Sequence, residues 1–189
     1  MSGIKTASAS ERLLQAAGEL FYAEGVHSVG IDRIIERAGV AKASLYNTFG
    51  SKESLVEAYL HQRHERMRAR VAVTLAEATT PRERLLAVFD AQARQVAEPG
   101  YRGCAFVAAS VEAPPGGAVG RASHDYRSWV RSLFVGPARE LGVKDPETLA
   151  RRLHLLFDGA SIAGWMDGDH DATAEARRAA AELIDAAAR

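Results

Sequence analysis

Cysteine is nearly absent from this chain of 189 residues, which also lacks long apolar runs, an excess of charge of one sign and convincing strand patterns. The single cysteine, Cys104, excludes an intramolecular disulfide. No uninterrupted apolar run reaches the roughly 18 residues of a membrane span and nothing resembles a secretion signal, so we expect a soluble, cytoplasmic protein. Excess charge is missing too, because 24 Lys and Arg balance 24 Asp and Glu, which argues against nucleic-acid binding through bulk positive charge.

Convincing strand patterns are also missing, whereas apolar residues recur at helical spacing along the chain. Helix starts are marked by the capping boxes at Ser8 and Thr80 and by the N-cap Asp145 before a proline. We predict an all-α protein of about nine helices. One of them runs from about residue 51 to 78, a buried one covers residues 103–109, and Gly136-Pro137 bends or breaks another.

The stretch from Gly30 to Glu53 organises the prediction. Apolar residues at helical spacing form a first short helix that Gly39 can end, because glycine adopts the positive φ of a helix C-terminus. A second short helix restarts near Ala41, with Leu45 and Phe49 pointing inward. The pattern is that of a helix-turn-helix.

The outer face of the second helix carries one cation, small groups and hydrogen-bonding side chains: Lys42, Ala43, Ser44, Tyr46 and Asn47. A slim helix of this kind fits the major groove of DNA, where base edges are read by hydrogen bonds and apolar contacts. Ser51 then caps the next helix and Lys52 lies in its first turn, which suits a phosphate oxygen.

The run GVAKASLYNTFGSKESL resembles the recognition-helix region of the TetR family of bacterial transcriptional regulators. The residues that match its pattern are Gly39, Val40, Lys42, Leu45, Tyr46, Phe49 and Lys52. Thr48 replaces a commoner His or Tyr but can still reach a phosphate, and Gly30 replaces a Ser or Thr cap. Lys5, before the first helix, is a further candidate for backbone contact by resemblance.

The resemblance implies a homodimeric regulator that binds a palindromic DNA operator, most often as a repressor, and is released by a small-molecule effector. We place the DNA-binding domain in residues 1–53 and an effector-binding and dimerisation domain in residues 54–189. By resemblance the last two helices form the dimer interface, and Ala160→Glu or Ala180→Glu is expected to give monomers. The helix that starts at Ser51 would belong to both domains and act as a lever.

Aromatic residues in the second domain are candidates for an apolar or aromatic effector, although plain core packing is the better explanation of any single one of them. The candidate effector-pocket residues are Phe89, Phe106, Tyr126, Trp129, Phe157 and Trp165. A different class of function, a helical small-molecule binder or enzyme with a vestigial helix-turn-helix, remains as an alternative.

Other chemistry is weakly supported. His61 and His64 have the spacing of metal ligands but lie among arginines, so a solvated polar face is the better interpretation. His154 and Asp158 could form an acid–base pair, yet no nucleophile or phosphate loop accompanies them. Apolar neighbours should leave Cys104 inert, although a redox sensor is the alternative. We expect no metal, cofactor or catalytic residue.

Overall fold

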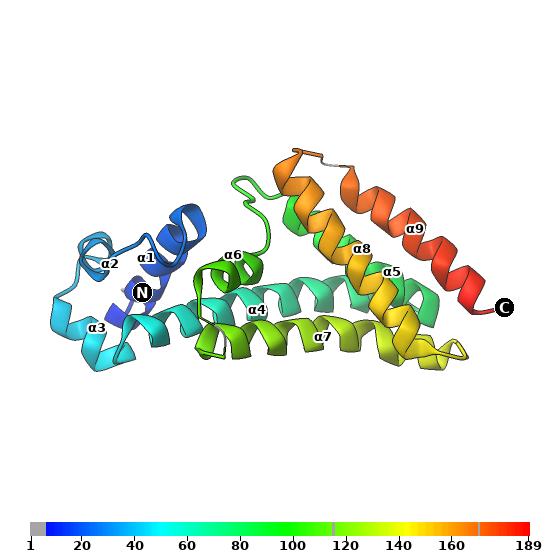
Figure 1. The fold of residues 1–189 in the computed structure, drawn as a ribbon, viewed down its shortest axis with the longest axis horizontal. Helices are drawn as coiled ribbons and strands as arrows, with labels where there is room; N and C mark the ends of the chain where they lie inside the picture. Colours follow the sequence, from blue (N-terminus) through cyan, green and yellow to red (C-terminus); the bar gives the residue numbers. More distant parts are fainter. Residues whose placement is uncertain (1–6, 115, 170) are drawn as a thin grey trace, which may run out of the picture. The chain divides into compact units, whose positions relative to one another are not determined.

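The computed structural model describes residues 7–114, 116–169 and 171–189, which form nine α-helices and no strand (Figure 1). The all-α prediction is confirmed. None of these helices combines the length and apolar character that a membrane crossing requires. In chain order the helices are α1 (Ala9–Glu24), α2 (Ile31–Ala38), α3 (Lys42–Phe49), α4 (Lys52–Ala76), α5 (Pro81–Val96), α6 (Ala105–Glu112), α7 (Ala118–Glu140), α8 (Pro146–Met166) and α9 (Ala172–Ala187).

The first compact unit contains the chain up to Arg63 together with the segment Ala105–Ser123. Helices α1, α2 and α3 pack on one another in it, and the ring of Phe21 meets that of Tyr59 on α4 edge-on at 5.7 Å between centroids. Its core consists of apolar side chains that are almost completely buried: Leu13, Ala17, Phe21, Val29, Ile34, Leu45, Leu55, Tyr59 and Leu60.

The second compact unit consists of His64–Cys104 and His124–Arg189. Helix α8 packs against both α5 and α9, as the ribbon shows (Figure 1). The ring of Phe89 lies 5.8 Å from that of Phe134 and 6.3 Å from that of Phe157, which brings α5, α7 and α8 around one aromatic centre.

The helix starts follow the local chemistry of the sequence. Ser8 and Glu11 form the reciprocal capping box of α1, and Thr80 and Glu83 form that of α5. The Asp145 carboxylate accepts a 3.0 Å hydrogen bond from the N–H of Thr148 at the start of α8. These three predictions are therefore confirmed.

One local prediction is wrong and another is wrong in part. Helix α7 does not break at Pro137 but continues through it to Glu140, with the buried Phe134 and Ala138 on either side of the proline; a bend at this position stays a prediction. Helix α6 is not buried all round. Phe106 and Ala109 are buried, but Val107 is 47% and Val111 is 83% exposed, because this short helix packs on one side only within its unit.

The bounds of the two compact units differ from those of the two functional domains that we predicted, residues 1–53 and 54–189. Residues 54–63 and the segment Ala105–Ser123 belong to the same compact unit as the first three helices. Two helices, α4 and α7, each contribute residues to both units. The assignment of DNA contact to residues 1–53 and of effector binding and dimerisation to residues 54–189 stays a prediction.

Candidate nucleic-acid interface

The turn between α2 and α3 is built around Gly39. Its φ of 62° and ψ of 44° are left-handed, and its N–H donates to the Glu36 carbonyl at 3.1 Å. The next N–H, that of Val40, donates to the Ile35 carbonyl at 3.2 Å. Ala41 is extended and α3 starts directly after it, so three residues, Gly39 to Ala41, join the two short helices.

Only one residue of α3, Leu45, is buried, and five of its eight residues are exposed to solvent. Leu45 is completely buried, and Phe49 is half-buried one turn later. Of the predicted DNA-binding residues, five are exposed and Ser44 and Lys52 are half-buried; the five are Lys42, Ala43, Tyr46, Asn47 and Thr48. The polar face that the sequence predicted is therefore accessible, and contact with DNA by these residues stays a prediction.

The cations near α3 are balanced by carboxylates. The ammonium of Lys42 lies 2.9 Å from the Asp32 carboxylate, and this hydrogen bond raises the pKa of Lys42. Both side chains are more than half exposed. Seven Lys and Arg balance seven Asp and Glu in residues 1–63, so affinity for DNA has to come from local placement of a few groups.

Two further ion pairs brace α2 against α1. The guanidinium of Arg33 binds the Glu24 carboxylate through two hydrogen bonds of 2.6 and 2.9 Å, and Arg37 binds Glu19 at 2.8 Å. These contacts lower the pKa of both carboxyl groups. Arginines that hold α2 in place are structural, which leaves Lys42 as the cation presented by α3.

The start of α4 has the predicted cap. The Ser51 hydroxyl accepts a 3.1 Å hydrogen bond from the N–H of Ser54. The ammonium of Lys52 is directed to the carbonyl oxygen of His27, 3.3 Å away in the α1–α2 loop. Lys5, the other candidate for backbone contact, lies outside the described residues.

Comparison with known proteins agrees with this geometry. The sequence profile described as "Bacterial regulatory proteins, tetR family" matches residues 13–59. An uncharacterised HTH-type transcriptional regulator of Mycobacterium tuberculosis is 31% identical over 152 residues, which is 80% of this chain and 72% of the relative. The chain belongs to the TetR family.

Structural comparison extends this likeness over the whole TetR-type fold. The crystal structure of a TetR-family transcriptional regulator from Streptomyces coelicolor is 33% identical, has a TM-score of 0.89 and covers 96% of both chains. The HTH-type transcriptional activator FasR of Mycolicibacterium smegmatis is 40% identical over 80 residues, 42% of this chain and 36% of that protein. This chain is therefore a transcriptional regulator of the TetR family.

The six candidate effector-pocket residues are distributed over both compact units. Phe89 and Phe157 belong to the aromatic centre of the second unit, and Tyr126 lies 5.9 Å from Trp129 between ring centroids. Phe106 belongs to the first unit. Trp165 is half-exposed and packs on Gly103, where an added Cβ would come within 2.9 Å of the ring. Their role in effector binding stays a prediction.

His64 and Asp158, considered above for metal binding and acid–base chemistry, contact neighbouring side chains in the second unit. His64 is half-buried between the rings of Tyr126 and Trp129, at 5.5 and 4.8 Å, so its predicted solvated position is wrong. Within the described residues no three or more His, Cys, Asp or Glu side chains gather as metal ligands would. Asp158 accepts two hydrogen bonds from Arg127, at 3.1 and 2.7 Å, which ties α7 to α8. Burial lowers the pKa of the neighbouring His154.

Two features escaped the sequence analysis. One is an exposed apolar stripe on α8, formed by Leu155, Ile162 and Met166. Their spacing of seven and four residues was visible in the sequence as a second apolar face of that helix. The other is a cavity in the first unit whose wall comes from three separate stretches of the chain, and no local sequence pattern indicates it.

Proposed function

We infer that this TetR-family chain is a homodimeric repressor that binds a palindromic operator and leaves it when a small effector binds. The observation that carries the proposal is α3, a helix with one buried residue and a polar face open to solvent. A protein that acts on bacterial DNA works in the cytoplasm. One relative, FasR, is an activator, so an experiment has to decide whether this chain represses or activates transcription.

Each protomer would place α3 in a major groove. Lys42 and Ala43, at the start of the helix, are within reach of base edges, whereas Tyr46, Thr48 and Lys52 would bind the phosphate backbone. One short helix reads too few base pairs to compete with a genome of non-specific sites, so two must act together. Their grooves are about 34 Å apart, or a multiple of that distance.

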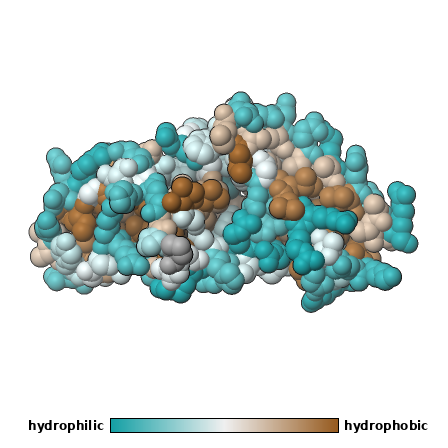
Figure 2. Space-filling model, in the orientation of Figure 1, coloured by the Kyte–Doolittle hydropathy of each residue, from teal (hydrophilic) through white to brown (hydrophobic). Residues whose placement is uncertain are grey.

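The stripe on α8 supports a dimer through the last two helices. Leu155 is 70% exposed, Ile162 is 48% exposed and Met166 is 69% exposed, and Gly159 lies among them with open space where a side chain would be. Figure 2 shows hydrophobic residues at the surface over α8 and α9. An isologous pair of α8 helices would bury this stripe twice, and the glycine would let the two helices approach closely.

The two substitutions that we predicted from the sequence to give monomers, Ala160→Glu and Ala180→Glu, do not test this interface. Ala160 is 4% exposed and Ala180 is completely buried, so both pack inside the protomer. Glutamate at either position would place a charge in the protomer's own core and unfold it. Variants of the exposed stripe, which leave that core intact, are the proper test.

Helix α4 supports the proposal of effector release. It starts at Lys52 in the first unit and runs into the second, where His64 packs on Trp129. A modest swing of this helix in each protomer would spoil the spacing of the two recognition helices. An effector with about a hundredfold preference for the swung state supplies about 2.7 kcal/mol of coupling, and operator DNA must weaken effector binding equally.

The test is fluorescence anisotropy with DNA from the promoter region beside the chain's own gene. We expect tight binding of one palindromic site and weak binding of a scrambled duplex of equal length. A small apolar or aromatic effector should change the fluorescence of Trp129 and Trp165, the only tryptophans, and release the operator over the same concentration range. If the effector saturates the change in tryptophan fluorescence while the affinity for the operator stays constant, effector release is refuted. If both duplexes bind equally, operator recognition is refuted.

The sign of regulation needs a separate measurement. A reporter gene behind the bound promoter should be transcribed more strongly when the regulator gene is deleted. Transcription that falls on deletion would identify an activator instead.

A further inference from the structure

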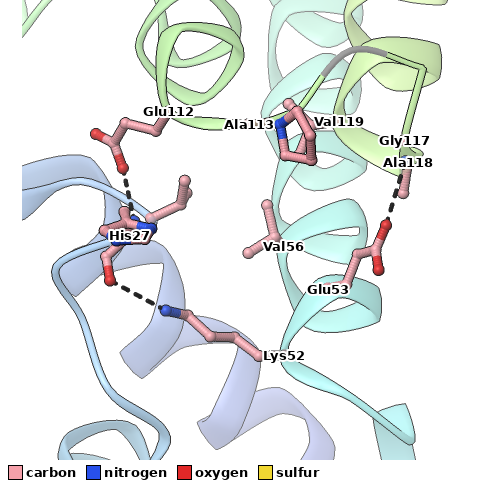
Figure 3. Close-up of a pocket in the computed structure, with 11 residues that line it drawn as sticks. His27, Lys52, Glu53, Val56, Glu112, Ala113, Gly117, Ala118 and Val119 are labelled. Atoms are coloured by element: carbon pink, nitrogen blue, oxygen red, sulfur yellow. Dashed lines mark hydrogen bonds between the residues drawn. The ribbon is translucent and has the colours of Figure 1, made fainter.

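The cavity in the first unit has a volume of about 370 Å³, within the range of small-molecule sites. Its wall is formed by the α1–α2 loop, the start of α4, the end of α6 and the start of α7 (Figure 3). All of these segments belong to the first compact unit. None of the six predicted effector-pocket residues lines this cavity.

The middle of the cavity is apolar. Val56 lies between the two sides in Figure 3, with Ala113 and Val119 above it in that view. Val26 and Pro114 add further apolar surface. This apolar middle of the cavity favours a hydrocarbon or aromatic group over a sugar or a phosphate.

The two carboxylates that line the cavity, those of Glu112 and Glu53, lie at opposite sides of its apolar middle (Figure 3). Glu112 accepts a 2.6 Å hydrogen bond from the N–H of His27, and Glu53 accepts one of 3.4 Å from the N–H of Ala118 (Figure 3). Lys52 also lines the cavity, but its ammonium is directed to the carbonyl of His27. Two carboxylates against one ammonium give the wall a net charge of −1.

The shape of the loop opposite lets Glu112 approach it closely. Gly25 has a φ of 93°, and a Cβ at this residue would come within 2.4 Å of the Glu112 carboxylate. The loop thus has a residue without a side chain at the point where the carboxylate lies against it. The Glu112 carboxylate therefore lies directly against this loop.

We propose that this cavity binds a small apolar molecule that carries one protonated amine. The ammonium lies beside Glu53 or Glu112, and the apolar part covers Val56 and Val119. Each carboxylate has only one backbone hydrogen bond among the described contacts, which leaves lone pairs for a cationic donor.

Occupancy of the cavity acts on DNA binding through the peptide group of His27. Its N–H is bound by Glu112 and its carbonyl by Lys52, the lysine proposed to contact a phosphate. A cation that competes for Glu112 shifts this loop and redirects Lys52. This step rests on the proposed function, whereas ligand binding itself does not.

The test uses three probes of similar shape and different charge: 2-phenylethylammonium, 2-phenylethanol and phenylacetate. Calorimetry on the full chain at pH 7 and low salt should show that the ammonium binds at least about tenfold tighter than the alcohol, as expected for a unit charge next to carboxylates at a protein surface. In amide NMR spectra, the largest shifts should be those of His27 and Ala118, whose N–H groups bind the two carboxylates.

Glu53→Gln and Glu112→Gln keep a side-chain oxygen that accepts the same backbone hydrogen bond but remove the charge. Each should weaken binding of the ammonium about tenfold and leave the alcohol unchanged. Glu57→Gln is the matched control, because Glu57 is exposed on the same helix and lies outside the wall.

The proposal fails if none of the probes binds, if the alcohol or phenylacetate binds as tightly as the ammonium, or if both variants bind it like the native chain. Binding with unchanged operator affinity overturns the link to DNA alone. Failure of operator binding in the ligand-free protein concerns the proposed function and leaves these results intact.

Discussion

Leu155→Glu tests the proposed dimer most directly. Leu155 is 70% exposed in the protomer, so glutamate there keeps the protomer's own core intact. In a twofold interface the same side chain is buried twice, once from each protomer. The substitution therefore removes two apolar contacts and places two carboxylates close to each other.

The size of the effect follows from the exposed area. Full burial of a Leu, Ile or Met side chain contributes about 1.5–3 kcal/mol, so 70% of a leucine contributes about 1–2 kcal/mol per protomer. Two copies make about 2–4 kcal/mol, which corresponds to a dimer dissociation constant raised about 30- to 700-fold. Repulsion between the carboxylates adds to this loss.

Sedimentation at several protein concentrations measures the dissociation constant, and circular dichroism checks the fold. Val73→Glu is the matched control, because Val73 is a 53% exposed apolar residue on α4, outside the proposed interface. We expect the Val73 variant to remain dimeric and the Leu155 variant to become a folded monomer. A folded Leu155→Glu protein that stays as dimeric as the native chain would place the interface elsewhere.

Three further predictions concern charged groups. Lys52→Ala should weaken binding to all DNA alike and reduce the slope of log affinity against log salt by about one per protomer; an unchanged slope removes Lys52 from the phosphate contacts. Asp32→Asn frees Lys42 from its carboxylate partner and removes a negative charge near the DNA, so anisotropy should show tighter binding to scrambled duplexes than for the native chain; unchanged binding there contradicts this role of Asp32. Hydrogen bonds from Thr79 and Thr80 lower the pKa of Glu83 from 4.5 to about 2, so Glu83 stabilises the fold above pH 4.5 and this contribution is lost as the pH falls towards 2. Urea unfolding of Glu83→Gln should accordingly show a shallower fall in stability over this range, and an identical pH profile contradicts the assignment.

Local chemistry explains which parts of the fold were predictable from sequence. The capping boxes at Ser8 and Thr80 and the left-handed Gly39 depend on residues within four positions of each other. The accessible face of α3 was predictable too, because only Leu45 and Phe49 point inward at helical spacing.

Features that depend on distant segments were not predictable from such patterns. Burial of Ala160 and exposure of Val111 are decided by which helices pack beside them, and composition alone does not specify this. The cavity joins residues near positions 26, 53 and 113, and the partner of Lys42 is ten residues away on another helix. An aromatic side chain in the core and one in a ligand pocket look identical in the sequence.

The segment Ala105–Ser123 belongs to the same compact unit as the helix-turn-helix, although some forty residues separate it from the end of the first stretch, at Arg63. The first compact unit is therefore discontinuous in the chain, and a single N-terminal fragment that ends at Arg63 does not contain all of it. A fragment that ends at residue 53 would stop two residues into α4 and lose Leu55 and Tyr59 from its core. A chimaera that gives this chain a new operator should exchange only the exposed positions of α3 and retain the remaining scaffold.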